Sequence, residues 1–234
     1  MRRRAEGEPS PGPFRLGLTE ALGAPALAMG ATFLAFGAAV AEAGLSLGWA
    51  LLCSGAVYGM AGQLVLLGVA AGPAGAALPA AIAATAANAR FLPMSVAIAP
   101  LLGPGRGRVL ALPFIAITPW AAGMRFLPTL PGADRLPWFL GFALASWLAG
   151  LVATAVGHGL APVLPASLRA ALLFANPLYF ALLLAADLDR PAVRASVIGG
   201  AVAAPLALWL GPAWGLLAAG GLGGTAAFLW TRRQ

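Results

Sequence analysis

Eight apolar stretches, each roughly twenty residues long, follow one another along this chain and restrict it to folds that lipid can surround. About 20 helical residues cross the ~30 Å hydrocarbon core of a bilayer. Because no water reaches backbone N–H and C=O groups there, these groups must bond within the segment, as a helix allows. The sequence therefore predicts an all-α, polytopic integral membrane protein. The stretches are residues 20–43, 46–71, 76–102, 108–126, 137–160, 166–188, 193–210 and 213–231.

Composition narrows the class further. The 234 residues are 61% hydrophobic and 9% charged, whereas soluble domains are roughly half apolar and a quarter charged. The net charge is +7, but the arginines stand at the ends of apolar stretches and form no basic stripe, so we expect no nucleic-acid partner. With one cysteine and one histidine, no metal-ligand or catalytic spacing is recognisable. We expect no metal, no cofactor and no enzymatic activity.

The ends and the topology can be predicted from charge. Residues 1–15 are polar and rich in Pro and Gly, which predicts a disordered cytoplasmic tail before a single membrane domain at 16–234. A cleaved signal peptide is the rival interpretation of the N-terminus. We expect six to eight transmembrane segments. If residues 46–71 and 166–188 are interrupted or re-entrant, one arginine fewer lies outside the cell than if all eight stretches span the membrane, which fits the preference for positive charge on the cytoplasmic side. In both arrangements we expect cytoplasmic termini, and we expect the protein in a bacterial inner membrane.

Short motifs recur in the same order about 115 residues apart. GLS, AGQ and GPAGA at 44–46, 61–63 and 72–76 are followed by GLA, ANP and RPAVRA at 159–161, 175–177 and 190–195. This order predicts an internal, inverted repeat with halves of roughly 20–118 and 135–231. Substrate sites of secondary transporters lie where interrupted helices of such halves meet. The matching interruptions here would be YGMAGQ and FANPLY.

Asn88 and Arg90 are polar residues in the middle of an apolar stretch. An ionisable side chain at membrane depth usually faces a cavity or a partner, so both are candidate substrate ligands. Pro93 follows and predicts a helix break there. The alternatives are a structural pair between Arg90 and Glu42, a bond to a backbone carbonyl, or a side chain that reaches the interface.

The two predicted interruptions supply further candidates. Gln63 follows Gly62 in a run of small residues, and Gly62 is the predicted helix break. The Gln63 amide is a candidate substrate ligand; the alternative is a hydrogen bond that links two helices. Asn176 and Tyr179 are the second-half counterparts, and Pro177 predicts a break that opens carbonyls to an ammonium group. A simple proline kink is the alternative there.

Glu42 and His158 are the titratable residues that we consider for a proton relay. Both stand near the ends of apolar stretches. Anchoring at the membrane interface is the favoured alternative for each.

These segments resemble, in order, the AzlC family of branched-chain amino-acid permeases. The likeness is carried by AEAGLS (41–46), SGAVYGMAGQLVLLGVAAG (54–72), NARFLPMSVAIAPLL (88–102), WFLGFALASWLAGLVATAVGHGL (138–160) and LLFANPLYFALLL (172–184). The resemblance implies export of branched-chain amino acids together with a small AzlD-like membrane subunit. Two departures bear on substrate and coupling: residues 114–124 carry no acid, and Phe91 stands where the family often has His.

The sequence thus favours a secondary transporter subunit that exports a small zwitterion, branched-chain amino acids first. The substrate carboxylate would meet Arg90 or a half-helix N-terminus. The ammonium group would meet Gln63 or Asn176. A non-transporting scaffold subunit is the main alternative, and a membrane-embedded enzyme is a weaker one, since seven acids and one histidine stand mostly in loops.

Overall fold

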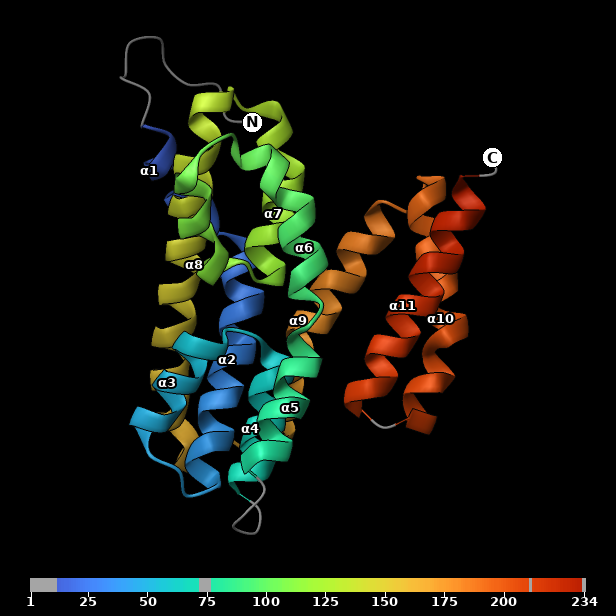
Figure 1. Ribbon diagram of the computed structural model, residues 1–234. Helices are drawn as coiled ribbons and strands as arrows, with labels where there is room; N and C mark the ends of the chain where they lie inside the picture. Colours follow the sequence, from blue (N-terminus) through green and yellow to red (C-terminus); the bar gives the residue numbers. More distant parts are fainter. Residues whose placement is uncertain (1–11, 72–76, 211, 233–234) are drawn as a thin grey trace. The chain divides into compact units, whose positions relative to one another are not determined.

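The computed structural model describes residues 12–71, 77–210 and 212–232, and every element in them is helical (Figure 1). The elements are α1 (Pro13–Ala21), α2 (Ala24–Glu42), α3 (Leu47–Val57), α4 (Met60–Ala70), α5 (Ala77–Asn88), α6 (Phe91–Ile98), the 3-10 turns η1 (Ala99–Leu102) and η2 (Arg106–Phe114), α7 (Ile117–Phe126), η3 (Leu127–Thr129), α8 (Gly132–Leu160), η4 (Ala161–Val163), α9 (Ala166–Ala186), α10 (Pro191–Leu210) and α11 (Pro212–Thr231). The predicted all-α class is confirmed.

Part of the range predicted as a disordered tail, residues 1–15, is helical. Helix α1 begins at Pro13, so the last residues of the range 1–15 are helical, while residues 1–11 lie outside the described part of the chain. Proline suits the first turn of a helix, because its missing N–H would have no intrahelical partner there.

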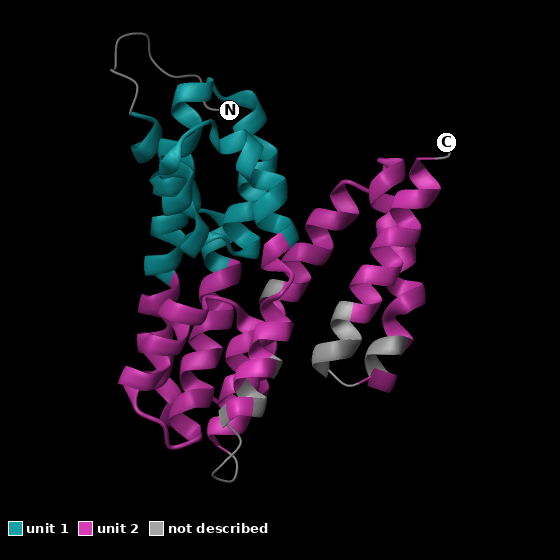
Figure 2. Ribbon diagram, viewed as in Figure 1, with its two compact units in different colours: residues 1–27, 93–149 teal, residues 28–92, 150–234 magenta. Residues whose placement is uncertain are grey.

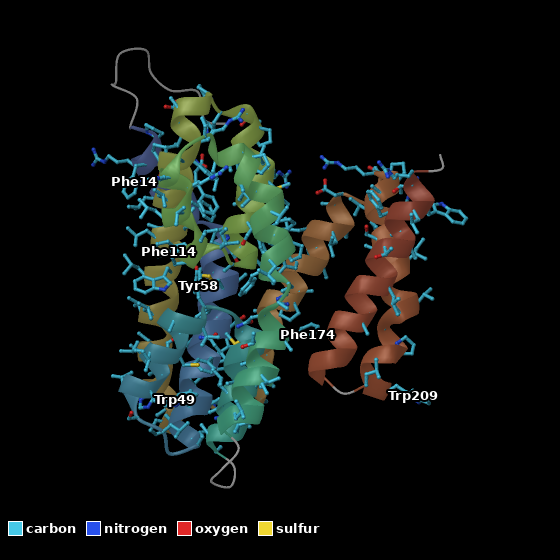
Figure 3. All side chains as sticks on the ribbon, in the orientation of Figure 1. Phe14, Trp49, Tyr58, Phe114, Phe174 and Trp209 are labelled. Carbon is cyan, nitrogen blue, oxygen red and sulfur yellow. The ribbon has the colours of Figure 1, made fainter. Side chains whose placement is uncertain are left out.

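Three of the described helices are long and apolar enough to cross a membrane: Ala24–Glu42, Gly132–Val163 and Ala166–Ala186. Helix α8 alone has 29 residues. That makes it about 43 Å long at 1.5 Å per residue, longer than a ~30 Å hydrocarbon core is thick. Large apolar side chains project outward, with Phe174 61% and Trp209 90% exposed (Figure 3). The chain is a membrane protein, and its total number of spans stays a prediction.

Three of the predicted stretches are divided. Residues 46–71 form α3 and α4, residues 76–102 form α5 and α6 with η1, and residues 108–126 include most of η2 and all of α7. The interruption expected in 166–188 is not observed, because α9 runs unbroken from Ala166 to Ala186. The predicted interruption is therefore confirmed in residues 46–71 and wrong in residues 166–188.

The chain divides into two compact units (Figure 2). Unit 1 comprises residues 1–27 and 93–149, and unit 2 comprises residues 28–92 and 150–234. In unit 1, the Trp138 ring stacks on Phe142 with centroids 5.3 Å apart, and its Nε1 donates to Glu20 Oε2 at 3.0 Å. In unit 2, Phe36 of α2 and Cys53 of α3 pack in one buried cluster. Each unit draws on both predicted repeat halves, and the repeat itself stays a prediction.

Glycines bring α2 and α8 into backbone contact within unit 2. A Cβ added to Gly37 would overlap the carbonyl oxygen of Thr154, and one added to Gly157 would overlap that of Leu34. Lipid provides no hydrophobic force between helices, so small residues that permit close backbone approach supply much of the association. The two reciprocal contacts fix how α8 lies against α2 in this unit.

Gly37→Ala should destabilise the protein, whereas Gly30→Ala, on the same helix, should not. At Gly30 an added Cβ meets no atom within 4 Å. The only effect expected there is the higher helix propensity of alanine, which stabilises the helix by about 1 kcal/mol. At Gly37 the obstacle is backbone, and overpacking costs about 1–3 kcal/mol. Thermal unfolding in detergent should show a melting temperature several degrees lower for Gly37→Ala only. Equal melting temperatures would contradict the close contact.

Candidate functional site

The first helix interruption lies between α3 and α4, at Tyr58 and Gly59. Tyr58 has φ 40° and ψ 33°, and among the described residues only glycines share its positive φ. Such a conformation costs about 1–3 kcal/mol and is typical of functional sites. Buried contacts hold it: the hydroxyl donates to Met29 Sδ at 3.8 Å, and the ring lies 6.1 Å from that of Phe33. The break predicted at Gly62 is corrected to this point, since Gly62 lies inside α4.

The second interruption lies between α5 and α6. Helix α5 ends at Asn88, α6 begins at Phe91, and Ala89 and Arg90 form a turn between them. The break predicted at Pro93 is corrected by a few residues, because Pro93 is the third residue of α6. Proline is tolerated there, since the first N–H groups of a helix have no partner inside it.

The structure tests only the helix break of the predicted second-half site. Pro177 lies inside α9 and does not break it. Tyr179 is half-buried, with its ring edge-on to Phe180 at 5.3 Å, a contact local to α9. The side chain of Asn176 lies outside the described part of the structure. The prediction that these residues join the site therefore stays untested, and the predicted helix break is wrong.

The two observed interruptions meet in unit 2, because α4 and α5 lie side by side (Figure 1). Gly59, directly before α4, and Gly62, in its first turn, face the side chain of Asn88 at the end of α5. A Cβ on Gly59 would come within 2.6 Å of Asn88 Oδ1, and one on Gly62 would overlap Asn88 Nδ2. Only glycines let this amide lie against a helix N-terminus, whose first N–H groups have no intrahelical partner.

Gln63 belongs to a hydrogen-bonded chain that joins three helices. The side chain is 0% exposed, and its Nε2 donates to Ser54 Oγ at 3.1 Å. Ser54 Oγ lies 2.9 Å from Thr154 Oγ1, which donates to the Gly150 carbonyl at 2.9 Å. Side-chain bonds of this kind link helices from within lipid. The interhelical role considered for Gln63 is thus observed, and it uses only the nitrogen of the amide.

Three polar atoms around the interruptions are buried without a partner within the described residues: Gln63 Oε1, Asn88 Oδ1 and Arg90 Nε. An unmade hydrogen bond of this kind costs about 1–3 kcal/mol per group. Buried polar groups are nearly always satisfied, so a local group of exceptions requires an explanation. Two carbonyl-type oxygens and one guanidinium nitrogen are complementary to the two ends of a zwitterion.

Arg90 is not paired with Glu42. Its guanidinium is half-buried and lies over the Phe91 ring, 5.7 Å from the centroid. Glu42 instead forms a salt bridge with Arg169. The structural Arg90–Glu42 pair considered from the sequence is therefore wrong, and Arg90 keeps donor capacity for a ligand.

Glu42 and His158 make contacts near the end of α2. Besides the Glu42–Arg169 salt bridge, His158 Nε2 lies 3.0 Å from the carbonyl oxygen of Leu45. Both contacts fit the anchoring alternative, and a proton relay stays a prediction. In the residues that the structure describes, no group of three or more His, Cys, Asp or Glu could share a metal ion.

A separate cavity lies within unit 1 and holds about 100 Å³. Most of the residues that line it are apolar, and Ser95 and Arg108 are its polar members. The apolar ones are Ile98, Ala99, Leu102, Val109, Leu112 and Ile115. It contains none of the predicted substrate ligands.

Ser54 and Thr154, which link the Gln63 amide to α8, are not among the candidate residues named from the sequence. Ser54 and Thr154 are 100 positions apart, so only the folded chain brings their hydroxyls together. The one signal for Thr154 was a hydroxyl in the middle of a long apolar stretch.

Interrupted helices that meet beside unpaired polar side chains, in a membrane protein, are typical of secondary transporters. A family model described as AzlC protein matches residues 25–164, more than half of the sequence, and the chain belongs to that family. The family is associated with branched-chain amino-acid transport and is not enzymatic. Comparisons with curated proteins and with solved structures gave no match. Ser54, Gln63, Asn88, Arg90 and Thr154 all lie within the matched region.

Gly62→Ala should strongly reduce amino-acid efflux without unfolding the protein. The added Cβ would displace the Asn88 amide, a side chain that can rotate away, so the loss falls on the site and not on the backbone. Gly68→Ala in the same helix is the matched control, since nothing lies within 4 Å of its Cβ position. In an amino-acid efflux assay we expect at least a tenfold loss for Gly62→Ala, from the displaced ligand group. Equal loss in both variants would sink this role for the Gly62–Asn88 contact.

Proposed function

We propose that this protein is the large subunit of a secondary transporter that exports small amino acids, branched-chain amino acids first, across the bacterial inner membrane. The observation that carries the proposal is the group of three buried, unpaired polar atoms beside two helix interruptions. The family's association with branched-chain amino-acid transport supports the choice of substrate. A small AzlD-like membrane subunit is the proposed partner.

The carboxylate of the substrate would bind at Arg90. A guanidinium binds a carboxylate through two parallel hydrogen bonds, which gives both strength and orientation. The N-terminus of α4 adds a second source of positive potential, because its unpaired N–H groups carry partial positive charge. The side chain of Asn88 already lies against that turn.

The ammonium group would bind to neutral oxygens. Gln63 Oε1 and Asn88 Oδ1 are acceptors without partners in the described structure. An ammonium group has only hydrogen-bond donors, so it can bind both oxygens without leaving an acceptor of its own unpaired. The two ends of a zwitterion would then neutralise each other's field at membrane depth, which lowers the cost of carrying charge there.

Transport also requires that the site opens. Gln63 is 0% exposed, so a substrate reaches it only when the surrounding helices move. The interruptions at Tyr58–Gly59 and Ala89–Arg90 are suitable hinges within unit 2, because a few residues can absorb the change in backbone angles. We propose that movement at these interruptions, driven by the proton-motive force, alternates access to the site.

Arg90→Ala tests the proposal. Loss of a charge-assisted, bidentate contact should reduce efflux of labelled leucine at least tenfold, since each such bond contributes about 1.5–3 kcal/mol. Arg90→Lys keeps the charge but not the fork and should also transport poorly. Arg194→Ala, at an exposed arginine of α10, is the matched control and should transport normally. Normal efflux by a correctly inserted Arg90→Ala variant would rule out this binding mode.

Reconstitution separates a transporter from a scaffold subunit. Proteoliposomes that contain this chain and its small partner should exchange internal unlabelled leucine for external labelled leucine. If the partner alone gives the same counterflow and this chain adds nothing to it, the chain is a scaffold and the proposed function fails.

A further inference from the structure

The protons in the hydrogen-bonded chain of unit 2 have a defined direction. Thr154 has one hydroxyl proton, and it is donated to the Gly150 carbonyl at 2.9 Å. In the 2.9 Å contact between the two hydroxyls, the proton must therefore come from Ser54. With that proton used, Ser54 Oγ can only accept from Gln63, so the amide must present Nε2 to it, as observed at 3.1 Å.

A consequence follows for the other end of the amide. With Nε2 directed at Ser54, Gln63 Oε1 is the atom left buried and without a partner. Were the amide flipped, Nε2 would occupy that place and present donors instead of an acceptor. The orientation of one side-chain amide thus decides whether the site accepts a donor such as an ammonium group or an acceptor such as a carbonyl.

We infer that Ser54 and Thr154 are positioning residues that hold the Gln63 amide with its oxygen toward the ligand, so that the site selects 2-amino acids over 2-oxo acids of the same shape. This inference rests on the proposed function for its substrate. Discrimination by a site that hydrogen-bonds the differing group is large, because the wrong ligand leaves buried groups unpaired. The 2-oxo acid would place its carbonyl oxygen against Gln63 Oε1, acceptor against acceptor.

Thr154→Val tests the inference, because valine keeps the shape of threonine and removes the hydroxyl. The Ser54 hydroxyl then has no acceptor on α8, so a flipped Gln63 amide that offers Oε1 to this hydroxyl is no longer disfavoured. In leucine counterflow, the preference for leucine over its 2-oxo acid should fall at least tenfold, while Thr154→Ser should restore it. A merely structural defect would lower transport of both compounds alike. Ser54→Ala gives a second break in the same chain of bonds.

Thr32→Val is the matched control. Thr32 is also buried, at 1% exposure in unit 2, but its hydroxyl donates to backbone carbonyls, of Ala28 at 3.1 Å and Leu172 at 3.5 Å, and not to the Ser54–Gln63 chain of bonds. This variant should keep the wild-type selectivity. An unchanged preference for leucine in Thr154→Val, or an equal loss in Thr32→Val, would overturn the inference.

The amide can also be observed directly. The chain has two glutamines, Gln63 and Gln234, so selective ¹⁵N and ¹³C glutamine labelling in a Gln234→Glu background reports on Gln63 alone. Solid-state NMR in bilayers should show its side-chain resonances shifted in Thr154→Val and unchanged in Thr32→Val. Unshifted resonances in Thr154→Val would overturn the inference. If the wild type transported no amino acid, the proposed function would fail while this measurement still decided the orientation of the amide.

Discussion

In hydrocarbon no water completes the hydrogen bonds of a polar group, and every feature of the candidate site depends on this constraint. A helix that ends at membrane depth leaves N–H or C=O groups without partners, which normally forbids it. Here two such ends occur together, at Tyr58–Gly59 and Ala89–Arg90. Their proximity places the Asn88 amide against the start of α4. Three of the six buried side-chain atoms without a partner in the described residues belong to Gln63, Asn88 and Arg90, beside these interruptions.

Helix packing and the polar chain are parts of one arrangement. The backbone contact between Gly37 and Thr154 brings α8 close to α2 in unit 2. The Thr154 hydroxyl then reaches Ser54 on α3, and Ser54 reaches Gln63 on α4. A larger side chain at Gly37 would move Thr154, and with it the hydroxyl that Ser54 contacts. Small residues here therefore set the geometry of a site that they do not themselves contact.

The all-α membrane class could be predicted from the sequence, because the length and the apolar character of its segments are enough to indicate membrane helices. The two interrupted segments were predicted from small residues near Gly62 and from Pro93, but the points of interruption were not. The left-handed conformation of Tyr58 depends on Met29 and Phe33, which are distant in sequence.

Proline shows the same limit. Pro93 stands in the first turn of a new helix, whereas Pro177 stands inside a continuous one, and neighbouring groups can accommodate the latter. Local sequence does not distinguish the two cases. The Ser54–Thr154 bond, 100 positions apart, has no local signal at all.

The chemistry of the site also explains why amides, and not carboxylates, lie beside the interruptions. A carboxylate would attract an ammonium group more strongly, but an unpaired buried charge is far more costly than an unpaired amide oxygen. A transporter must return to its empty state in every cycle, so that cost would recur each time the substrate leaves. Gln63 and Asn88 remain neutral with or without substrate, and the one permanent charge, Arg90, lies over an aromatic face that partly compensates it. Moderate, oriented binding suits a protein that has to release what it binds.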